Sequence, residues 1–227
     1  MKALLLFGSP KGKAGTSYVL GGALARRLEA RGVECAEMTV AEVLRSTEDQ
    51  HALHKALDAA DVLVVSFPLY YDQLPAPLVQ VLELIAERRK GGFAASPWSG
   101  PALQKVAAVV QCGFPETVHT RSAVDIMRQF AREAGFEWAG ALAMGMGGAV
   151  ARKPLDKAGG MVRGVVKALD MTAISLAAGG AVPDEAAALI AKPLMPKWIY
   201  NLFANGSFRS QLKRHGAKAR ANDQPYA

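Results

Sequence analysis

The uninterrupted apolar run at residues 61–67 places the tightest constraint on how this chain folds. It reads Asp-Val-Leu-Val-Val-Ser-Phe. A strand with one wet face would alternate apolar and polar residues, so a continuous run of this length predicts a strand that is buried on both faces. Such strands are typical of parallel sheets that carry helices on both sides. A second apolar run, Lys2 to Phe7, predicts another strand.

Strands and helices alternate along roughly the first 145 residues. We predict strands at residues 2–7, 33–40, 61–67, 105–112 and 136–144. Between them we predict a helix that ends at Arg31-Gly32 and helices at residues 46–60, 75–90 and 117–135. This alternation predicts an α/β fold in which a five-stranded parallel sheet is doubly wound by right-handed crossovers. Ligands of such sheets bind beyond the carboxyl ends of the strands.

The composition fits one globular unit. With 227 residues, about half of them apolar, the chain is long enough to bury a sizeable core. We divide it into a sheet domain at residues 1–150 and a helical extension at residues 151–227 of the same unit, with helices at 153–179 and 183–191. The start of the chain lacks a signal-peptide pattern, and its uncharged runs are shorter than the roughly 18 residues of a membrane span. We therefore expect a soluble, cytoplasmic protein.

The loop after the first strand predicts a binding site for phosphate or another anion. From residue 8 to residue 17 it reads Gly-Ser-Pro-Lys-Gly-Lys-Ala-Gly-Thr-Ser and leads into a helix. We expect a run of free backbone N–H groups here, because the first turn of a helix lacks intrahelical acceptors and the helix dipole adds positive charge. The candidate anion ligands are Ser9, Lys11, Gly15, Thr16 and Ser17. The alternative is an ordinary turn in which Thr16 or Ser17, as a natural N-cap, only caps the helix.

The segment after the third strand predicts a flat binding surface. It runs from Pro68 to Pro77 and reads Pro-Leu-Tyr-Tyr-Asp-Gln-Leu-Pro-Ala-Pro. Two adjacent tyrosines, Tyr70 and Tyr71, are held between prolines, which makes a stiff platform for an aromatic ring. The alternative is that both tyrosines only pack the loop.

The segment after the fourth strand predicts a close approach of backbone to a ligand. It reads Gln-Cys-Gly-Phe-Pro-Glu from residue 111 to residue 116, and Gly113 would permit that approach. Gln111 or Glu116 could contact the ligand, or either could cap the next helix. A further glycine-rich segment, residues 145–148, either bounds the same site or forms a flexible turn.

Together the three segments resemble the flavodoxin-like NAD(P)H-dependent FMN reductases and quinone reductases. Gly-Ser-Pro-Lys before Thr-Ser resembles their phosphate loop, and the proline, aromatic pair and Leu-Pro-Ala of the second segment resemble their ring-binding loop. The resemblance covers about the first 145 residues. It implies an FMN site formed by Ser9, Lys11, Gly15, Thr16, Ser17, Pro68, Leu69, Tyr70, Tyr71, Asp72, Gln73, Leu74, Gln111, Cys112, Gly113 and Phe114.

The resemblance also implies an enzyme that passes hydride from NAD(P)H, through bound FMN, to a quinone, a free flavin or another small acceptor. We assign no catalytic residue, because in such enzymes the cofactor carries the chemistry. His119 is either a contact for nicotinamide or substrate or, as we favour, an exposed surface residue. The alternative functions are a flavodoxin-like electron carrier, which would typically be acidic rather than basic, and a module that binds a nucleotide without catalysis.

The two cysteines indicate neither a disulfide framework nor a metal site. Cys35 and Cys112 lie in separate predicted strands, without the spacing of metal ligands. We expect both to be buried thiols, and we expect no bound metal.

Residues 192–227 carry most of the charge. They hold seven Lys or Arg residues and one acidic residue, a net charge of +6 out of +7 for the whole chain. We expect Trp198, Tyr200 and Phe203 to bury against the body of the protein or a partner subunit, and residues 213–220 to stay solvated and mobile. We favour this over contact with an anionic membrane, and we expect no nucleic acid, because no recognition motif accompanies the charge. The resemblance implies a homodimer or homotetramer.

Overall fold

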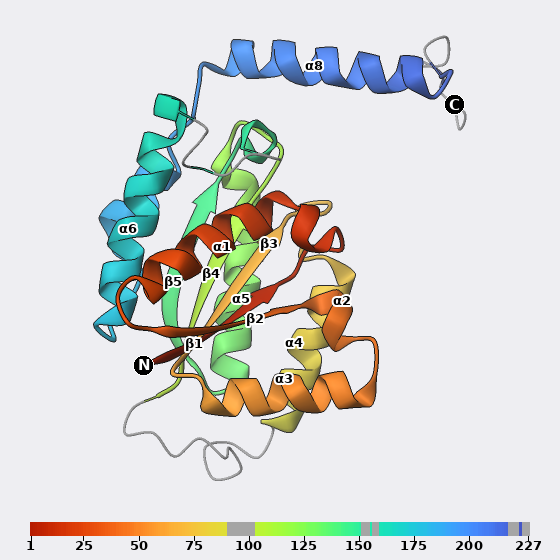
Figure 1. The fold of residues 1–227 in the computed structure, drawn as a ribbon. Coiled ribbons are helices and arrows are strands. Elements are labelled where there is room, and N and C mark those ends of the chain that lie inside the picture. Colours follow the sequence, from red (N-terminus) through yellow and green to blue (C-terminus); the bar gives the residue numbers. More distant parts are fainter. Residues whose placement is uncertain (90–102, 151–154, 156–158, 218–222, 224–227) are drawn as a thin grey trace.

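The protein is built around one sheet of five parallel strands (Figure 1). The computed structural model describes residues 1–89, 103–150, 155, 159–217 and 223. The strands are β1 (Lys2–Phe7), β2 (Glu34–Thr39), β3 (Val62–Pro68), β4 (Lys105–Gln111) and β5 (Glu137–Met144). Their order across the sheet is β2-β1-β3-β4-β5, and every neighbouring pair is parallel. The predicted fold class is confirmed.

Helices cover both faces of this sheet. The α-helices are α1 (Thr16–Glu29), α2 (Val40–Val43), α3 (Thr47–Ala59), α4 (Ala76–Arg88), α5 (Arg121–Glu133), α6 (Arg163–Ala177), α7 (Asp184–Ile190) and α8 (Lys197–Arg214). Short 3-10 helices are η1 (Gly12–Ala14), η2 (Thr117–Thr120), η3 (Gly147–Ala149) and η5 (Gly159–Val162). Helices α1, α6 and α7 contribute buried side chains to the core on one face, and α2, α3, α4 and α5 contribute to the core on the other.

Strand β3 joins the two cores. All seven of its residues are buried. Val62 and Val64 belong to the core under α1, whereas Leu63, Val65 and Phe67 belong to the core on the opposite face. Because successive side chains of a strand point to opposite faces, a strand that is apolar at nearly every position must be covered on both sides.

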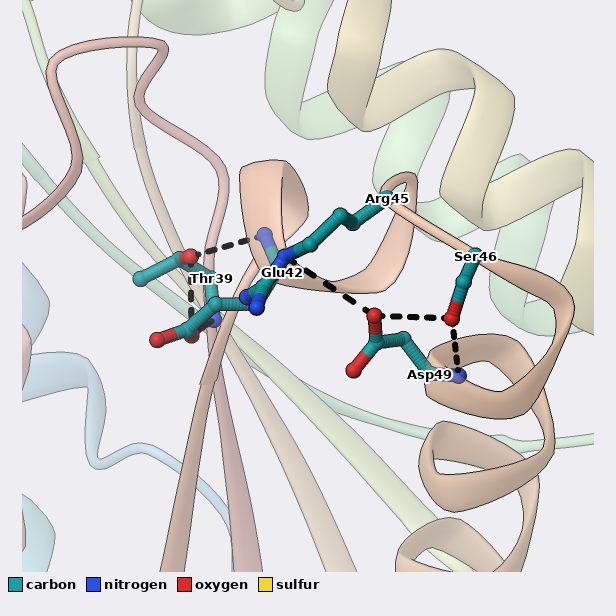
Figure 2. Close-up of polar contacts among 5 residues, drawn as sticks. All are labelled: Thr39, Glu42, Arg45, Ser46 and Asp49. Carbon is teal, nitrogen blue, oxygen red and sulfur yellow. Dashed lines mark hydrogen bonds and ion pairs between the residues drawn. The ribbon is translucent and has the colours of Figure 1, made fainter.

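Side-chain caps fix the connection between β2 and α3 (Figure 2). Thr39 Oγ1 accepts a hydrogen bond from Glu42 N–H at 3.2 Å, and the Glu42 carboxylate accepts one from Thr39 N–H at 2.8 Å, so that α2 begins with a capping box. The hydrogen bonds that Thr39 N–H and Thr39 Oγ1 donate to the Glu42 carboxylate lower the pKa of Glu42. Ser46 caps α3 by accepting from Asp49 N–H at 3.1 Å, which confirms the predicted start of that helix.

Two predicted helices begin later than expected. The helix predicted from residue 117 starts as η2, where the Thr120 hydroxyl donates to Thr117 O at 2.6 Å and tightens the turn before α5. The helix predicted from residue 153 becomes α6, which begins at Arg163, because Gly159 has a φ of +71° that a right-handed helix does not allow. Residues 153, 154 and 156–158 lie outside the described part of the chain.

The two cysteines differ in burial. Cys112 is buried, as predicted. Cys35 is only half-buried, so that prediction is wrong for this residue; its strand, β2, lies at the edge of the sheet and has a single neighbouring strand. Partial burial of the thiol, together with the nearby carboxylates of Glu29 and Glu37, raises the pKa of Cys35 to about 11.

Helix α8 lies apart from the two cores and is joined to the rest of the chain at its amino-terminal end (Figure 1). Trp198 is 69% exposed and Phe203 is 68% exposed, so the expectation that they bury against the body of the protein is wrong. Their burial against a partner subunit stays a prediction. Lys213 and Arg214 are exposed in the last turn of α8, whereas residues 218–220 lie outside the described residues. No helix in the described part of the chain has the length and apolar character needed to cross a bilayer.

Candidate functional site

The loops that follow β1, β3 and β4 meet at one edge of the sheet. Because the strands are parallel, their carboxyl ends lie at the same edge. Backbone N–H groups join each loop to a neighbouring strand: Gly8 donates to Ser66 O at 2.9 Å, Leu69 to Gln111 O at 2.9 Å, and Cys112 to Met144 O at 3.0 Å. The structure therefore brings the three predicted segments together.

The loop between β1 and α1 is wound around the side chain of Ser9. This side chain is buried, and its Oγ accepts a hydrogen bond from Lys11 N–H at 3.2 Å. The Ser9 carbonyl accepts from Gly12 N–H at 2.9 Å, and Gly12 has a φ of +52°, which favours glycine. A Cβ on Gly15 would lie 2.8 Å from Ser9 Oγ, so glycine lets the loop close at this point.

Fewer loop amides are free than the sequence suggested. The N–H groups of Ala14 and Gly15 donate within the loop, because the chain forms η1 there. Counting acceptors among the described residues only, the N–H groups of Ser9, Lys13, Thr16 and Ser17 have none. The expected run of free donors is therefore interrupted by the hydrogen bonds within the loop.

Ser17 has a buried hydroxyl group without a hydrogen-bond partner among the described residues. Its backbone is held in place, because the Ser66 hydroxyl donates to Ser17 O at 2.7 Å. A buried polar group without a partner is unfavourable, and native structures usually provide one. An unpaired hydroxyl and unpaired amides in the first turn of a helix therefore suit an anionic ligand.

The N-cap of α1 is Gly15 rather than Thr16 or Ser17. Thr16 is the first helical residue, and its hydroxyl donates to Gly147 O at 3.3 Å. The N-cap prediction is wrong because the hydroxyl of Thr16 is engaged with the loop that follows β5. This contact joins the loop after β1 to the loop after β5.

The segment after β3 forms a tight hairpin turn. Tyr70 and Gln73 exchange two backbone hydrogen bonds, at 3.0 Å and 3.1 Å. The central residues, Tyr71 and Asp72, have φ angles of +51° and +58°, and such strained conformations in residues other than glycine occur often at ligand sites. Tyr71 is fully exposed, so it does not pack the loop. The flanking predicted residues support the turn from its buried or half-buried side: Pro68, Leu69 and Leu74.

His119 joins the hairpin turn to the loop after β4. Its Nδ1 lies 3.7 Å from Asp72 Oδ1, and its ring stacks on Phe114 with 4.4 Å between ring centres. The Ser122 hydroxyl also holds the turn by donating to Asp72 O at 2.7 Å. We expected an exposed surface residue at position 119, whereas His119 is half-buried and contacts both the hairpin turn and the loop after β4.

The loop after β4 packs closely against the glycine-rich loop after β5. Gln111 and Cys112 are buried, and Cys112 O accepts a hydrogen bond from Gly147 N–H at 2.8 Å. A Cβ on Gly147 would lie 1.7 Å from Gln111 Oε1, and one on Gly145 would lie 2.4 Å from Pro115 O. Residues 145–148 therefore bound the site. Burial raises the pKa of the Cys112 thiol.

Helix α8 contributes two contacts that the sequence did not indicate. The Tyr200 hydroxyl donates to Gly113 O at 2.7 Å, and Lys197 Nζ lies 2.7 Å from Glu116 Oε1. Burial raises the pKa of Tyr200, and the hydrogen bond from Lys197 lowers the pKa of Glu116. Glu116 makes no side-chain cap to η2, so it holds α8 rather than the next helix.

The donor set at this edge fits a phosphate-bearing flavin such as FMN. The free amides and the Ser17 hydroxyl suit a phosphate, and Lys11 and Lys13 are exposed in the same loop. Tyr71 and Phe114 offer exposed aromatic rings from the two neighbouring loops. Within the described ranges, no group of three or more His, Cys, Asp or Glu side chains could hold a metal ion.

Comparisons with known proteins agree with this geometry. A family model described as a flavodoxin-like fold matches residues 1–158. A search of curated proteins found no match to the chain.

Several solved structures share the fold. An NAD(P)H:quinone oxidoreductase from Methanothermobacter marburgensis is 16% identical, with 78% of this chain and 96% of that chain covered and a TM-score of 0.56. A flavodoxin from Streptococcus pneumoniae TIGR4 is 15% identical, with 79% and 99% covered and a TM-score of 0.53. The Trp repressor binding protein from Bacillus subtilis is 10% identical, with 74% and 95% covered and a TM-score of 0.52. At these identities the likeness shows the fold alone.

Proposed function

Because the chain belongs to the flavodoxin-like-fold family, we propose that it is an FMN-dependent oxidoreductase that passes hydride from NAD(P)H to a quinone, a free flavin or another small acceptor. The observation that carries the proposal is the buried hydroxyl of Ser17 in the first turn of α1, which has no partner among the described residues, together with free backbone amides and exposed lysines in the preceding loop. The shared fold of an NAD(P)H:quinone oxidoreductase supports it.

The first loop would hold the phosphate. Ser17 would gain the partner that its hydroxyl lacks, and the N–H groups of Ser9 and Thr16 would donate to the same anion. Lys11 would add charge from the solvent side, while Gly15 lets the loop close over Ser9. When bound, FMN would supply the two-electron chemistry, so the chain's own residues bind and orient rather than react.

The second and third loops would frame the ring. The hairpin turn would present Tyr71 and the backbone of Tyr70, Asp72 and Gln73, and the loop after β4 would present the edge formed by residues 111–114. His119 would position both loops through its contacts with Asp72 and Phe114. Pro68, Leu69 and Leu74 would support the turn from behind.

A flavodoxin-like electron carrier is the second candidate, because a flavodoxin shares the fold over nearly its whole length. The net charge of +7 speaks against it, since carriers of that kind are typically acidic. A nucleotide-binding module without catalysis is the third candidate.

We also propose that the chain acts as one cytoplasmic globular unit that forms a homodimer or homotetramer. Helix α6 packs in the same core as α1, which supports a single unit. The exposed side chains of Trp198 and Leu202, four residues apart on α8, support self-association, because large apolar side chains exposed together are typical of interfaces.

The test of the proposed function starts from flavin-free protein. We expect FMN to bind, to lose fluorescence on binding and to raise the melting temperature. We also expect steady NAD(P)H oxidation with a quinone that depends on added FMN. Binding without turnover would favour the carrier, and absence of FMN binding would contradict the assignment.

A lysine variant tests the phosphate site within the same experiment. Lys11→Ala removes a charge-assisted contact of roughly 1.5–3 kcal/mol, so FMN affinity should fall about tenfold to a hundredfold. Lys55→Ala is the matched control, because Lys55 is an exposed lysine that lies with Lys2 and Glu34 near the other edge of the sheet. Equal affinity in both variants would show that Lys11 does not meet the phosphate.

A further inference from the structure

A cavity of about 510 Å³ lies between α8 and the loops at the carboxyl edge of the sheet. Its volume falls within the range of roughly 300–1,000 Å³ that is typical of small-molecule sites. Its walls come from three separate segments: η3 in the loop after β5, the 3-10 helix η5, and α8 together with Met195, two residues before it. The main lining residues are Ala149, Met161, Met195, Tyr200, Phe203 and Phe208.

One face of α8 forms a wall of this cavity. Tyr200, Phe203 and Ser207 line it, and their spacing of three and four residues places them on the same side of the helix. Trp198 and Leu202 do not line it; they lie on the other side of α8 and are exposed. The helix therefore presents two different faces, and only one of them faces the cavity.

Tyr200 links this cavity to the candidate flavin site. It lines the cavity, and its hydroxyl donates to Gly113 O in the loop after β4. Gly148, which also lines the cavity, is adjacent to Gly147, whose N–H donates to Cys112 O in that same loop. A molecule in the cavity would thus lie beside the loop proposed to frame the ring.

The described lining residues are mostly apolar or aromatic, which favours an aromatic molecule. Among the described residues, no Asp, Glu, Lys, Arg or His side chain lines the cavity. Two methionines from different segments offer adaptable apolar contacts, and Phe203 and Phe208 offer aromatic ones although they are 68% and 59% exposed. Ser207 and Gln211 can donate to a carbonyl group of the ligand, whereas Tyr200, whose hydroxyl hydrogen is bonded to Gly113 O, can accept from a ligand hydroxyl group.

We propose that this cavity binds a flat, uncharged molecule of two or three fused aromatic rings that carries carbonyl or hydroxyl groups. The proposal deepens the proposed function, since such a molecule would be the electron acceptor, and α8 would be the element that selects it. Tyr200 is then a positioning residue that connects the acceptor site to the loop after β4.

Binding of 1,4-naphthoquinone to the full chain, measured by equilibrium dialysis without FMN or NAD(P)H, tests the cavity separately from the proposed function. Ala204→Trp fills the cavity from α8, because Ala204 lines it. Leu202→Trp is the matched control on the exposed face. We expect binding to the wild-type chain, about tenfold weaker binding to Ala204→Trp, and a change below about twofold in Leu202→Trp.

A kinetic arm connects the cavity to turnover. With FMN and NAD(P)H present, the KM for 1,4-naphthoquinone should rise about tenfold in Ala204→Trp, while the KM for ferricyanide, a small anion that does not need an aromatic pocket, should stay unchanged. If FMN does not bind but naphthoquinone binding still depends on position 204, the proposed function fails and the cavity stands.

Two outcomes would overturn the proposal. If wild type and Ala204→Trp bind naphthoquinone equally well, the molecule binds elsewhere. If wild type does not bind naphthoquinone, the cavity is not an acceptor site, and a fall in the mass of Ala204→Trp in solution to that of a monomer would then assign the cavity to a second copy of the chain.

Discussion

Strand β3 and helix α8 are packed in opposite ways. All seven residues of β3 are buried, and its side chains belong to both cores. None of the 18 residues of α8, all of them described, is buried, and Tyr200 and Lys197, which bond to the body of the protein, lie in its first turn. The strand that leads into the loop proposed to frame the ring is thus fully packed, whereas the helix that would meet the acceptor is packed much less.

The difference extends to the glycines of the two regions. At the carboxyl edge of the sheet, a Cβ on Gly145 would collide with backbone, whereas a Cβ on Gly206 in α8 would meet nothing within 4 Å. A site built on tightly packed elements holds its ligand in one precise position, whereas an adaptable surface accepts ligands of several shapes. We infer that substitutions around the proposed cofactor site would weaken binding more than substitutions around the proposed acceptor site.

The largest difference in the free energy of unfolding is expected between two leucine variants. Leu63 in β3 is completely buried, so Leu63→Ala should lower the free energy of unfolding by about 2–5 kcal/mol. Leu202 in α8 is 65% exposed, so Leu202→Ala should change it by no more than about 0.5 kcal/mol. Urea unfolding of flavin-free protein measures both. A large loss in Leu202→Ala would show that α8 is covered in solution.

The next contrast compares two glycines of the site. Gly145→Ala would place a Cβ 2.4 Å from Pro115 O, and because backbone must then shift, it should cost about 1–3 kcal/mol of folding free energy. Gly113→Ala is the control, since a Cβ there would meet nothing within 4 Å, and the change should be below about 0.5 kcal/mol. Both are measured by urea unfolding without flavin. Equal stabilities would mean that the loops after β4 and β5 move apart freely.

Local sequence patterns were sufficient to predict the sheet and the order of the loops at its carboxyl edge. Residues 61–67 are apolar at nearly every position, so a strand formed by them is stable only if both of its faces are buried. This requirement holds whatever the rest of the chain does. The loops follow from where the strands end, because parallel strands bring their carboxyl ends to one edge.

Contacts between distant segments could not be read from the sequence. The hydroxyl of Thr16 was expected to cap its own helix, but it bonds to Gly147, 131 residues away. Likewise Tyr200 meets Gly113 across 87 residues, and no local spacing announces either pair. Apolar content alone predicted burial for Trp198 and Phe203, but a segment buries against the body only if a complementary surface lies within its reach, which depends on the fold.

A third experiment separates ligand binding from packing at two buried hydroxyl groups. Ser17→Ala removes an unpartnered buried hydroxyl group, so the flavin-free protein should become more stable, by roughly 1 kcal/mol, while FMN affinity should fall about tenfold. Thr172→Val is the matched control, because Thr172 Oγ1 is also buried without a partner among the described residues but lies in α6. It should stabilise the protein without changing FMN affinity. Lower stability of flavin-free Ser17→Ala would contradict the role proposed for Ser17.

The largest deletion is expected to have only a small effect on stability. Truncation after Ala191 removes the hydrogen bond from Tyr200 to Gly113, worth about 0.5–1.5 kcal/mol, the exposed ion pair between Lys197 and Glu116, and the packing of the half-buried Leu194 against the core, but no fully buried side chain among the described residues. For a chain of this length, each kcal/mol lowers the melting temperature by roughly 2–4 °C, so the fall should stay within a few degrees. FMN affinity should fall by less than about tenfold, because the phosphate loop makes no hydrogen bond with α8 among the described residues and only the loop after β4 loses its bond from Tyr200. Naphthoquinone binding should be lost. The mass in solution should fall if the face formed by Trp198 and Leu202 joins subunits.

Two other results would contradict this view of α8. A large fall in melting temperature would show that α8 is an integral part of the core. Loss of liposome binding at constant mass and constant melting temperature would assign the face formed by Trp198 and Leu202 to a membrane surface.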